Sequence, residues 1–336
     1  SMIRELPQGE IYKDRLKLEI KMIKDKKLIG YIMRSLEILK MTKNIPHVTR
    51  GSCGSSLVCY LLGISHVDPI KYNIKFSRFL NKYRDNLPDI DFDFPYNMRD
   101  EVFLKLQMKW PNKIARISNH VYYHEKSAKR ESLRSIGIRG FISKYEINDV
   151  ILGLDKTQKR EFNLNMHEIE GTFRCFSLHC GGIVYYPEGV PEDLKLKQIK
   201  DEINKNGLCQ IVLNKYDVSN SNQFKIDILS SRGLAQLHES LDYRMIDFER
   251  HYEDIKTKEL LMNGDNIGLT FAESPLIRKS FMKIKPKSVD EIAICLSIIR
   301  PAAKDARDFE ELEELEDMFV YDDDAIDILS KSLNCD

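Results

Sequence analysis

The sequence lacks any long apolar run. No stretch of its 336 residues approaches the roughly 20 apolar residues that a membrane-spanning helix needs. The first residues, Ser1-Met2-Ile3-Arg4-Glu5, lead into a charged segment and have no apolar core like that of a signal peptide. We therefore expect no membrane partner and no secretion, and a protein of the cytoplasm.

Paired cysteines are also missing. The seven cysteines are scattered along the chain, their number is odd, and none forms a C-x-x-C pair. That pattern argues against a structural zinc site and indicates a reducing compartment.

The chain carries no excess charge of either sign, with 52 basic and 52 acidic residues. Total charge thus gives no support for nucleic-acid binding, which depends on local clusters. Apolar residues make up 42% of the chain and charged residues 31%, as in ordinary globular proteins. The length allows two or three domains.

Acidic and apolar residues alternate in Leu87-Pro88-Asp89-Ile90-Asp91-Phe92-Asp93-Phe94. In a β-strand, Asp89, Asp91 and Asp93 would line one face, and the apolar residues would enter a core on the other. Such a repulsive row suits a cation, and ligands that are all oxygen favour Mg²⁺ or Mn²⁺. The alternative is an edge strand with a solvated acidic face.

A turn rich in small residues precedes this row. Thr49-Arg50-Gly51-Ser52-Cys53-Gly54-Ser55-Ser56 leads into an apolar run at residues 57–62. Small residues before a helix expose backbone N–H groups and leave room for a phosphate. No G-K-[ST] follows, so the turn is not a P-loop, and an ordinary helix N-cap explains it equally well.

A second charged strand is predicted far downstream. In Phe224-Lys225-Ile226-Asp227-Ile228-Leu229, alternation places Lys225 and Asp227 on one face and apolar residues on the other. A lone strand Asp is usually a surface residue, but beside the acidic row Asp227 becomes a candidate third carboxylate.

The remaining patterns divide the chain into helical and β parts. Residues 12–43 read as helical with a break at Gly30, residues 96–172 as a polar and mostly helical segment, and residues 241–336 as helical. Strand-like runs at 181–186 and 210–213 give the region from residue 174 a β texture. The tract from Asp305 to Asp327 is strongly acidic, as in a solvated surface or a partner contact.

The helical segment 96–172 contains a basic cluster with aromatic residues just upstream. Basic residues interleaved with aromatics suit a nucleic-acid backbone, and a solvated helix face is the alternative. The residues of this cluster are Lys126, Lys129, Arg130, Arg134 and Arg139.

Taken in order, these motifs resemble the polymerase core of the bacterial DNA polymerase III α subunit, the C-family replicative polymerases. Arg50 to Val58 resembles the family's R-G-S-G-x-x-S-L-V turn, and residues 87–94 its P-D-x-D-x-D-F signature. The remaining matches are Arg15-Leu16-Lys17-Leu18-Glu19, Asp68-Pro69 with Phe76 to Asn81, His179-Cys180-Gly181-Gly182-Ile183-Val184 (H-A-G-G-V-V), Lys225 to Leu229 (K-x-D-x-L), and Phe271-Ala272-Glu273-Ser274 with Arg300-Pro301.

The resemblance implies an α+β fold with a palm like that of polymerase β-type nucleotidyltransferases, a mixed sheet with helices. The palm would comprise residues 1–95 and 173–240, with a helical thumb at 96–172 and truncated helical fingers at 241–336. The implied activity is DNA-directed DNA synthesis by a two-metal mechanism with Mg²⁺ or Mn²⁺. Primer–template DNA and deoxynucleoside triphosphates would be the partners, with other replication proteins as further ones.

The resemblance also assigns roles to residues. Asp91, Asp93 and Asp227 would be catalytic metal ligands, with Asp89 either structural or in support of the ligands. Lys225 would lie near the transferring charge, and His179 is either near the site or a buried structural residue. Two further sets complete the site: Arg50, Gly51 and Ser52 would bind the nucleotide phosphates, and Lys126, Lys129, Arg130 and Arg134 would bind DNA.

Some family features are missing from the sequence. The N-terminal phosphoesterase domain, the fingers stretch L-R-R-A-M-G-K-K, the clamp motif, the OB domain and the helix-hairpin-helix element do not occur, and Tyr321-Asp322-Asp323-Asp324 stands where the family has Y-Q-E-Q. We therefore expect a reduced or truncated core with low processivity. The alternatives are a non-catalytic module that binds DNA or the replisome, and a template-independent nucleotidyltransferase.

Overall fold

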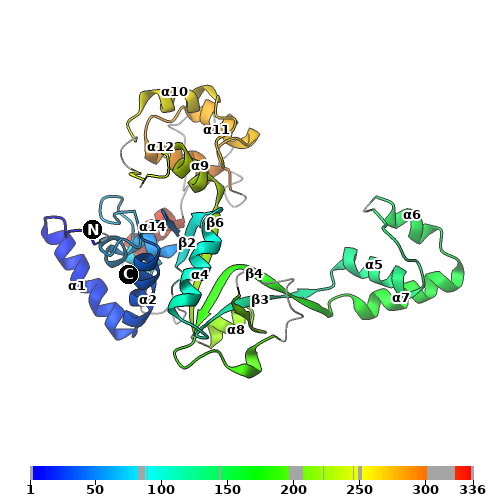
Figure 1. Ribbon diagram of the computed structural model, residues 1–336. Helices are drawn as coiled ribbons and strands as arrows, with labels where there is room; N and C mark the ends of the chain where they lie inside the picture. Colours follow the sequence, from blue (N-terminus) through cyan, green and yellow to red (C-terminus); the bar gives the residue numbers. More distant parts are fainter. Residues whose placement is uncertain are drawn as a thin grey trace. The chain divides into compact units, whose positions relative to one another are not determined.

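The chain forms two compact units, Ser1–Ser230 and Ser231–Asp336, each described here by itself. Figure 1 traces them in a computed structural model. The division falls ten residues before the boundary expected at residue 240. The structure describes residues 3–81, 88, 90–143, 145–196, 207–221, 223–244, 246–248, 252–300 and 322–333.

The first unit begins with two helices, α1 (Glu10–Asp25) and α2 (Ile29–Met41). The predicted break at Gly30 is wrong by a few residues, since Gly30 is already helical in α2. The chain turns instead at Lys27, whose φ of 57° lies in the left-handed region that ends helices. The apolar faces of both helices enter the main core, as their spacing predicted.

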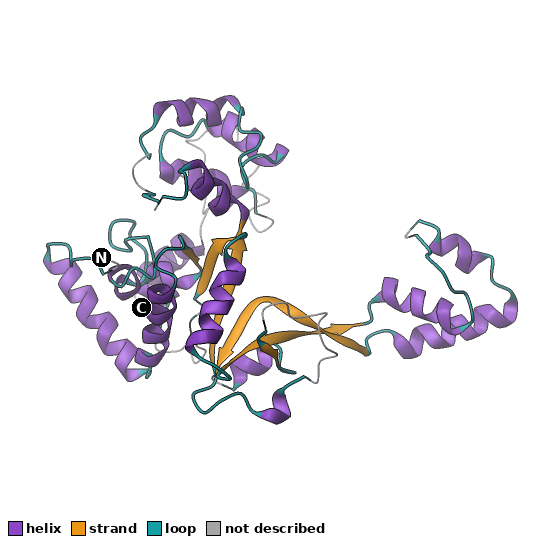
Figure 2. Ribbon diagram, viewed as in Figure 1, coloured by secondary structure: helices purple, strands orange, loops and turns teal. Residues whose placement is uncertain are grey.

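A mixed sheet is the centre of this unit, with strand order β1-β2-β6-β4-β3-β5 (Figure 2). The pairs β1–β2, β3–β4 and β4–β6 are antiparallel, and β3–β5 is parallel. Sheet and helices together confirm the α+β class. The strands are β1 (Val48–Arg50), β2 (Asp91–Pro95), β3 (Ile114–Tyr122), β4 (Phe173–Tyr185), β5 (Cys209–Gln210) and β6 (Phe224–Ser231).

The alternation predicted for the acidic strand is confirmed on its apolar side. Ile90, Phe92 and Phe94 are buried in the main core, together with Ile226 and Ile228 of β6. Helix α4 (Arg99–Lys109) packs against the same core. The charged residues of β2 and β6 therefore face the opposite side of the sheet.

Strand β3 was missed by the sequence analysis, which read residues 96–172 as mostly helical. The segment instead crosses the sheet between β4 and β5. Its alternation is obscured because Arg116, a residue expected in solvent, is buried between the buried Ala115 and Ile117. Residues 96–122 thus belong to the sheet and to α4, and only the later part of the segment is helical.

A helical insertion joins the outer ends of β3 and β4 (Figure 1). It consists of α5 (Glu125–Ser135), α6 (Ile147–Leu152) and α7 (Lys156–Ile169). The N-cap of α7 is Asp155, whose carboxylate accepts a hydrogen bond from the Gln158 backbone N–H at 2.8 Å. The insertion has a small core of its own, formed by Leu133, Ile147, Leu154 and Phe162.

Short elements complete the first unit between the strands. They are the 3₁₀ turns η1 (Ser52–Ser55), η2 (Phe76–Arg78) and η3 (Glu192–Leu194), and the helices α3 (Leu57–Leu61) and α8 (Lys215–Asn220). Helix α8 contributes Val218 to a second apolar cluster, which includes Ile117 and Val184.

The second unit is helical in its described part, as predicted. Capping residues explain where its helices begin: Ser231, Asp254, Ser274 and Ser288 each accept a hydrogen bond from a backbone N–H three residues on. The acidic tract lies outside the described residues up to position 321, and its end is helical in α14. The helices are α9 (Arg232–Ser240), α10 (Ile255–Asn263), α11 (Pro275–Ile284), α12 (Val289–Ile298) and α14 (Asp322–Leu333).

Membrane spans and cysteine pairing were the two remaining questions raised by the sequence. Across the described ranges, no helix is both long and apolar enough to cross a membrane. The six cysteines in the same ranges are all free thiols, in agreement with their unpaired spacing.

Candidate active site

Asp91 and Asp93 lie on the sheet face opposite the main core. Asp93 is buried, whereas Asp91 is half-buried. Strand β1 runs beside them, with Arg50 paired to Asp91 and Val48 to Asp93. Asp89, the first acid of the predicted row, falls outside the described residues.

The guanidinium of Arg50 holds Asp93. Its Nε and Nη2 donate to the two carboxylate oxygens, the second at 3.1 Å. This forked ion pair raises the pKa of Arg50. Arg50, predicted to bind a nucleotide phosphate, therefore contacts a predicted metal ligand, while more than half of its side chain stays exposed.

Asp227 is brought to the acidic strand by β6, which neighbours β2 in the sheet. Its backbone N–H donates to the carbonyl of Ile90 at 3.4 Å. Lys225 Nζ donates to Asp227 Oδ2 at 2.8 Å, so the prediction that these two residues share a face is confirmed. Asp227 Oδ1 is shielded from solvent and accepts no hydrogen bond from the described part of the chain.

His179 lies next to Asp227, with 3.9 Å between Nδ1 and Oδ1. The backbone N–H groups of Gly181 and Gly182 donate to this Nδ1, at 3.3 and 2.8 Å. Nδ1 therefore carries a lone pair and cannot donate to the carboxylate. Burial also lowers the pKa of His179, although the nearby charge of Asp227 acts to raise it. The contact is that of a neutral imidazole, not an ion pair.

Glycine allows β4 to approach this carboxylate. Gly182 pairs with Asp227 across the strands. A Cβ at Gly182 would lie 3.1 Å from Asp227 Oδ1, and one at Gly181 only 2.5 Å from the carbonyl oxygen of Ile228. Side chains at these positions would push β4 away from β6.

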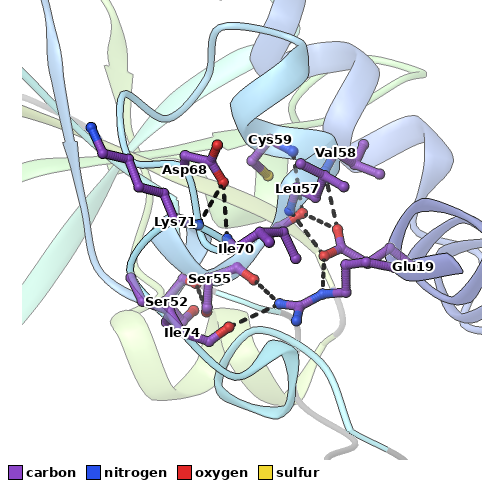
Figure 3. A network of polar contacts seen from close by, with 12 residues as sticks. Glu19, Ser52, Ser55, Leu57, Val58, Cys59, Asp68, Ile70, Lys71 and Ile74 are labelled. Atoms are coloured by element: carbon purple, nitrogen blue, oxygen red, sulfur yellow. Dashed lines mark hydrogen bonds and ion pairs between the residues drawn. The ribbon is translucent and has the colours of Figure 1, made fainter. Parts of the chain in front are cut away.

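The Gly/Ser turn has a partner that the sequence analysis did not identify. Glu19 of α1 is fully buried and accepts hydrogen bonds from Ser56 Oγ at 2.8 Å and from the N–H groups of Leu57 and Val58 at 2.9 and 3.0 Å (Figure 3). Arg15 donates to the same carboxylate at 2.7 Å. The anion position at the start of α3 is thus filled by the protein's own carboxylate.

Arg15 also fixes the turn directly. Its Nη2 donates to the carbonyls of Ser55 and Ile74, at 2.8 and 3.1 Å. The four-residue spacing of Arg15 and Glu19 on one helix was the available signal for this ion pair. Just before it, Gly51 has a φ of 84°, and Ser52 Oγ is buried with no hydrogen-bond partner among the described residues.

The predicted DNA-binding residues lie on a helix, apart in sequence from the acidic strands β2 and β6. Lys126, Lys129, Arg130 and Arg134 are all on α5. Lys129 pairs with Glu125 and Arg134 with Glu131 along the same helix. Arg130 and Arg134 line a surface cavity of about 250 Å³ together with Phe141.

Two models of one protein family match this chain. A family model described as the bacterial DNA polymerase III alpha NTPase domain matches residues 3–230. The chain belongs to the bacterial DNA polymerase III alpha family. A second model of the family, described as the subunit's finger domain, matches residues 232–334. The boundary between the two matches coincides with the division between the two compact units.

Curated members of the family are similar over most of this chain. A DNA polymerase III subunit alpha of Thermotoga maritima is 30% identical over 301 residues, covering 88% of this chain and 32% of the relative. One from Staphylococcus aureus is 31% identical over 323 residues, covering 87% and 30%. One from Staphylococcus epidermidis is 31% identical over 339 residues, covering 89% and 31%. The chain spans about a third of the length of these relatives.

Divalent metal ions are the general cofactors of DNA polymerases, and the donors at this site suit them. Asp91, Asp93 and Asp227 supply only oxygen, and Asp227 Oδ1 has no hydrogen-bond donor in the described ranges. The described side chains nevertheless include no group of three His, Cys, Asp or Glu residues that could hold an ion as they stand. Carboxylate oxygens suit a hard cation in their chemistry, but in this structure Arg50 and Lys225 are bound to two of the three carboxylates.

Proposed function

We propose that this chain is a metal-dependent nucleotidyltransferase that adds deoxynucleotides to the 3′ end of a DNA primer on a template. The observation that carries the proposal is the meeting of Asp227 with the strand of Asp91 and Asp93, because residues more than 130 positions apart form one acidic face. Membership of the DNA polymerase III alpha family supports it.

The three carboxylates are the proposed ligands for two Mg²⁺ or Mn²⁺ ions. Bound ions would lower the barrier to attack by the primer 3′-hydroxyl and stabilise the pyrophosphate leaving group. Asp227 Oδ1 is the oxygen best prepared for this role, since it lacks a competing donor among the described residues. Asp93 shares its oxygens with Arg50, whose forked hydrogen bonds orient that carboxylate.

We assign the binding of the incoming nucleotide's triphosphate to Arg50, Gly51 and Ser52. Arg50 is exposed enough to meet a phosphate while it holds Asp93. Ser52 Oγ lacks a partner in the described structure, and the positive φ of Gly51 turns the backbone beside it. Lys225 adds positive charge next to the reacting centre. The N-terminus of α3 is excluded from this role because Glu19 fills it.

The remaining parts receive supporting roles. The sheet acts as the palm, the α5–α7 insertion as the thumb and the second unit as the fingers. Lys126, Lys129, Arg130 and Arg134 would contact the phosphates of the DNA backbone, an attraction that weakens with salt and carries no sequence preference.

Primer extension with Mg²⁺ or Mn²⁺ tests the proposal. We expect Asp91→Asn and Asp227→Asn each to lower incorporation on a primer–template by about 10³-fold, since an amide is a poor ligand for a divalent ion. Asp14→Asn is the control, because that exposed carboxylate pairs with Lys17 on the surface of α1 and lies on a different element from the acidic strands. Equal incorporation by all three variants would contradict the assigned site.

One observation favours a second candidate, a non-catalytic module that binds DNA. Asp93 and Asp227 are already paired with Arg50 and Lys225, so the acidic face is partly neutralised without an ion. DNA retention in a gel shift, with no incorporation at any metal concentration, would support this candidate. Incorporation on a single-stranded primer without template would instead indicate a template-independent transferase.

A further inference from the structure

Arg116 is a buried cation on β3, with 2% of its surface exposed. It forms no ion pair with any carboxylate of the described residues, and its Nε has no hydrogen-bond partner there. Burial lowers the pKa of this guanidinium to about 10. Since an unpaired buried charge is strongly destabilising, its presence calls for a compensating role.

The guanidinium contacts one short segment of β4. Its Nη2 donates to the carbonyls of His179 at 2.8 Å and Cys180 at 3.3 Å. The Phe103 ring of α4 covers its other side, 4.3 Å from ring centre to Cζ. Arg99 of α4 donates to the same Cys180 carbonyl at 3.0 Å.

This segment is a bulge. Arg116 pairs with Ile183 and Ser118 with Leu178, so two steps along β3 correspond to five along β4. Three extra residues of β4 are accommodated there, and their backbone groups lose regular ladder partners on the β3 side. The carbonyls of His179 and Cys180 need other donors, and Arg116 supplies them.

The opposite side of the bulge faces the acidic site. Gly182 pairs with Asp227, and His179 Nδ1 accepts the Gly182 N–H while lying 3.9 Å from Asp227 Oδ1. Because the bulge turns its own N–H groups onto His179, neither the backbone nor the imidazole donates to Asp227 Oδ1. The conformation of the bulge therefore decides whether that oxygen is available to a ligand.

We propose that Arg116 is a positioning residue, which holds the His179–Gly182 bulge so that Asp227 Oδ1 is left free of protein donors. The expected effect of Arg116 on catalysis rests on the proposed function. Its effect on the conformation of the bulge does not depend on that function. The buried cation acts through the two carbonyls and does not touch the substrate.

A variant series separates this role from a general contribution to stability. Arg116→Met removes the donors at similar length, and Arg116→Lys keeps a charge that can reach at least one carbonyl. Arg34→Met is the control, because Arg34 also lies over aromatic rings, those of Trp110 and Tyr185, while its guanidinium pairs with Glu37 of its own helix.

Amide hydrogen exchange of the whole chain without metal or DNA is the first readout. We expect Arg116→Met to accelerate exchange at Gly181 and Gly182 by at least about 10-fold, with Arg116→Lys intermediate and Arg34→Met unchanged. If Arg116→Met does not fold, the exchange rates of Arg116→Lys and Arg34→Met at the two glycines are compared instead, and that comparison decides the role of Arg116. Unchanged exchange at both glycines in the folded Arg116 variant would overturn the proposal.

Metal binding and turnover form the second readout. Arg116→Met should weaken Mn²⁺ binding and lower kcat by about 10- to 100-fold, as for residues that orient metal ligands, with the KM for nucleotide nearly unchanged. A change in KM alone would contradict the positioning role. A wild-type chain with neither Mn²⁺ binding nor turnover would refute the proposed function, while the exchange result would still decide the role of Arg116.

Discussion

Glu19 and Asp227 are carboxylates of the same unit, one buried and one half-buried, and they differ in how fully their oxygens are hydrogen-bonded. Each Glu19 oxygen accepts two hydrogen bonds, from Arg15 and Leu57 on one and from Ser56 and Val58 on the other. Asp227 has Lys225 on Oδ2 and no donor from the described residues on Oδ1.

Under the proposed function, the difference separates a structural charge from one that binds a ligand. A buried carboxylate whose lone pairs are all used has no capacity left for a ligand, and its contacts hold α1 to the turn before α3. A carboxylate with an unused oxygen is costly unless something else binds there. The first residue should therefore matter for stability and the second for activity.

The largest effect is expected at Glu19. Glu19→Ala leaves Arg15 and two N–H groups of α3 without their acceptor, so we expect the free energy of unfolding to fall by about 3–5 kcal/mol. Denaturant unfolding measures this. Glu10→Ala on the same helix, which breaks only an exposed pair with Lys13, should cost less than about 1 kcal/mol. Similar losses for the two variants would refute the structural role.

A smaller loss is expected where β4 packs on β6. In Gly181→Ala the new Cβ meets the Ile228 carbonyl, so we expect about 1–3 kcal/mol of destabilisation and a fall in activity as β4 moves from Asp227. Gly30→Ala is the control, because nothing lies within 4 Å of that position in α2. It should stabilise by up to about 1 kcal/mol. A tolerated alanine at 181 would show that close packing is not required.

The smallest change in stability is expected at Asp227 itself. Asp227→Asn retains an acceptor for Lys225 and removes a repulsive charge, so the free energy of unfolding should change by no more than about 1 kcal/mol. Thermal unfolding without metal measures this change. The same variant is expected to lose nucleotide incorporation, so the two measurements together separate stability from activity. A loss as large as that for Glu19→Ala would abolish the distinction between the two carboxylates.

Local patterns were enough to predict much of the fold. Alternation identified β2 and β6 and their buried faces, and apolar residues at three-to-five spacing identified the helices α1 and α2, because both periods follow from backbone geometry. Strand β3 was missed because Arg116 interrupts its apolar pattern, and only the carbonyls of a distant bulge explain a buried arginine there.

The same division applies to the site. The sequence by itself determined which residues could form it. Charge on apolar strands marked Asp89, Asp91, Asp93, Lys225 and Asp227, and the resemblance to the polymerase family then assigned the metal ligands among them. Tertiary structure alone decided their partners: Arg50 on Asp93, Glu19 at the start of α3, and the bulge beside Asp227. The physical reason is that alternation sets only the face on which a side chain lies. Strand order and register decide which charges meet across that face, and they depend on the packing of the whole sheet.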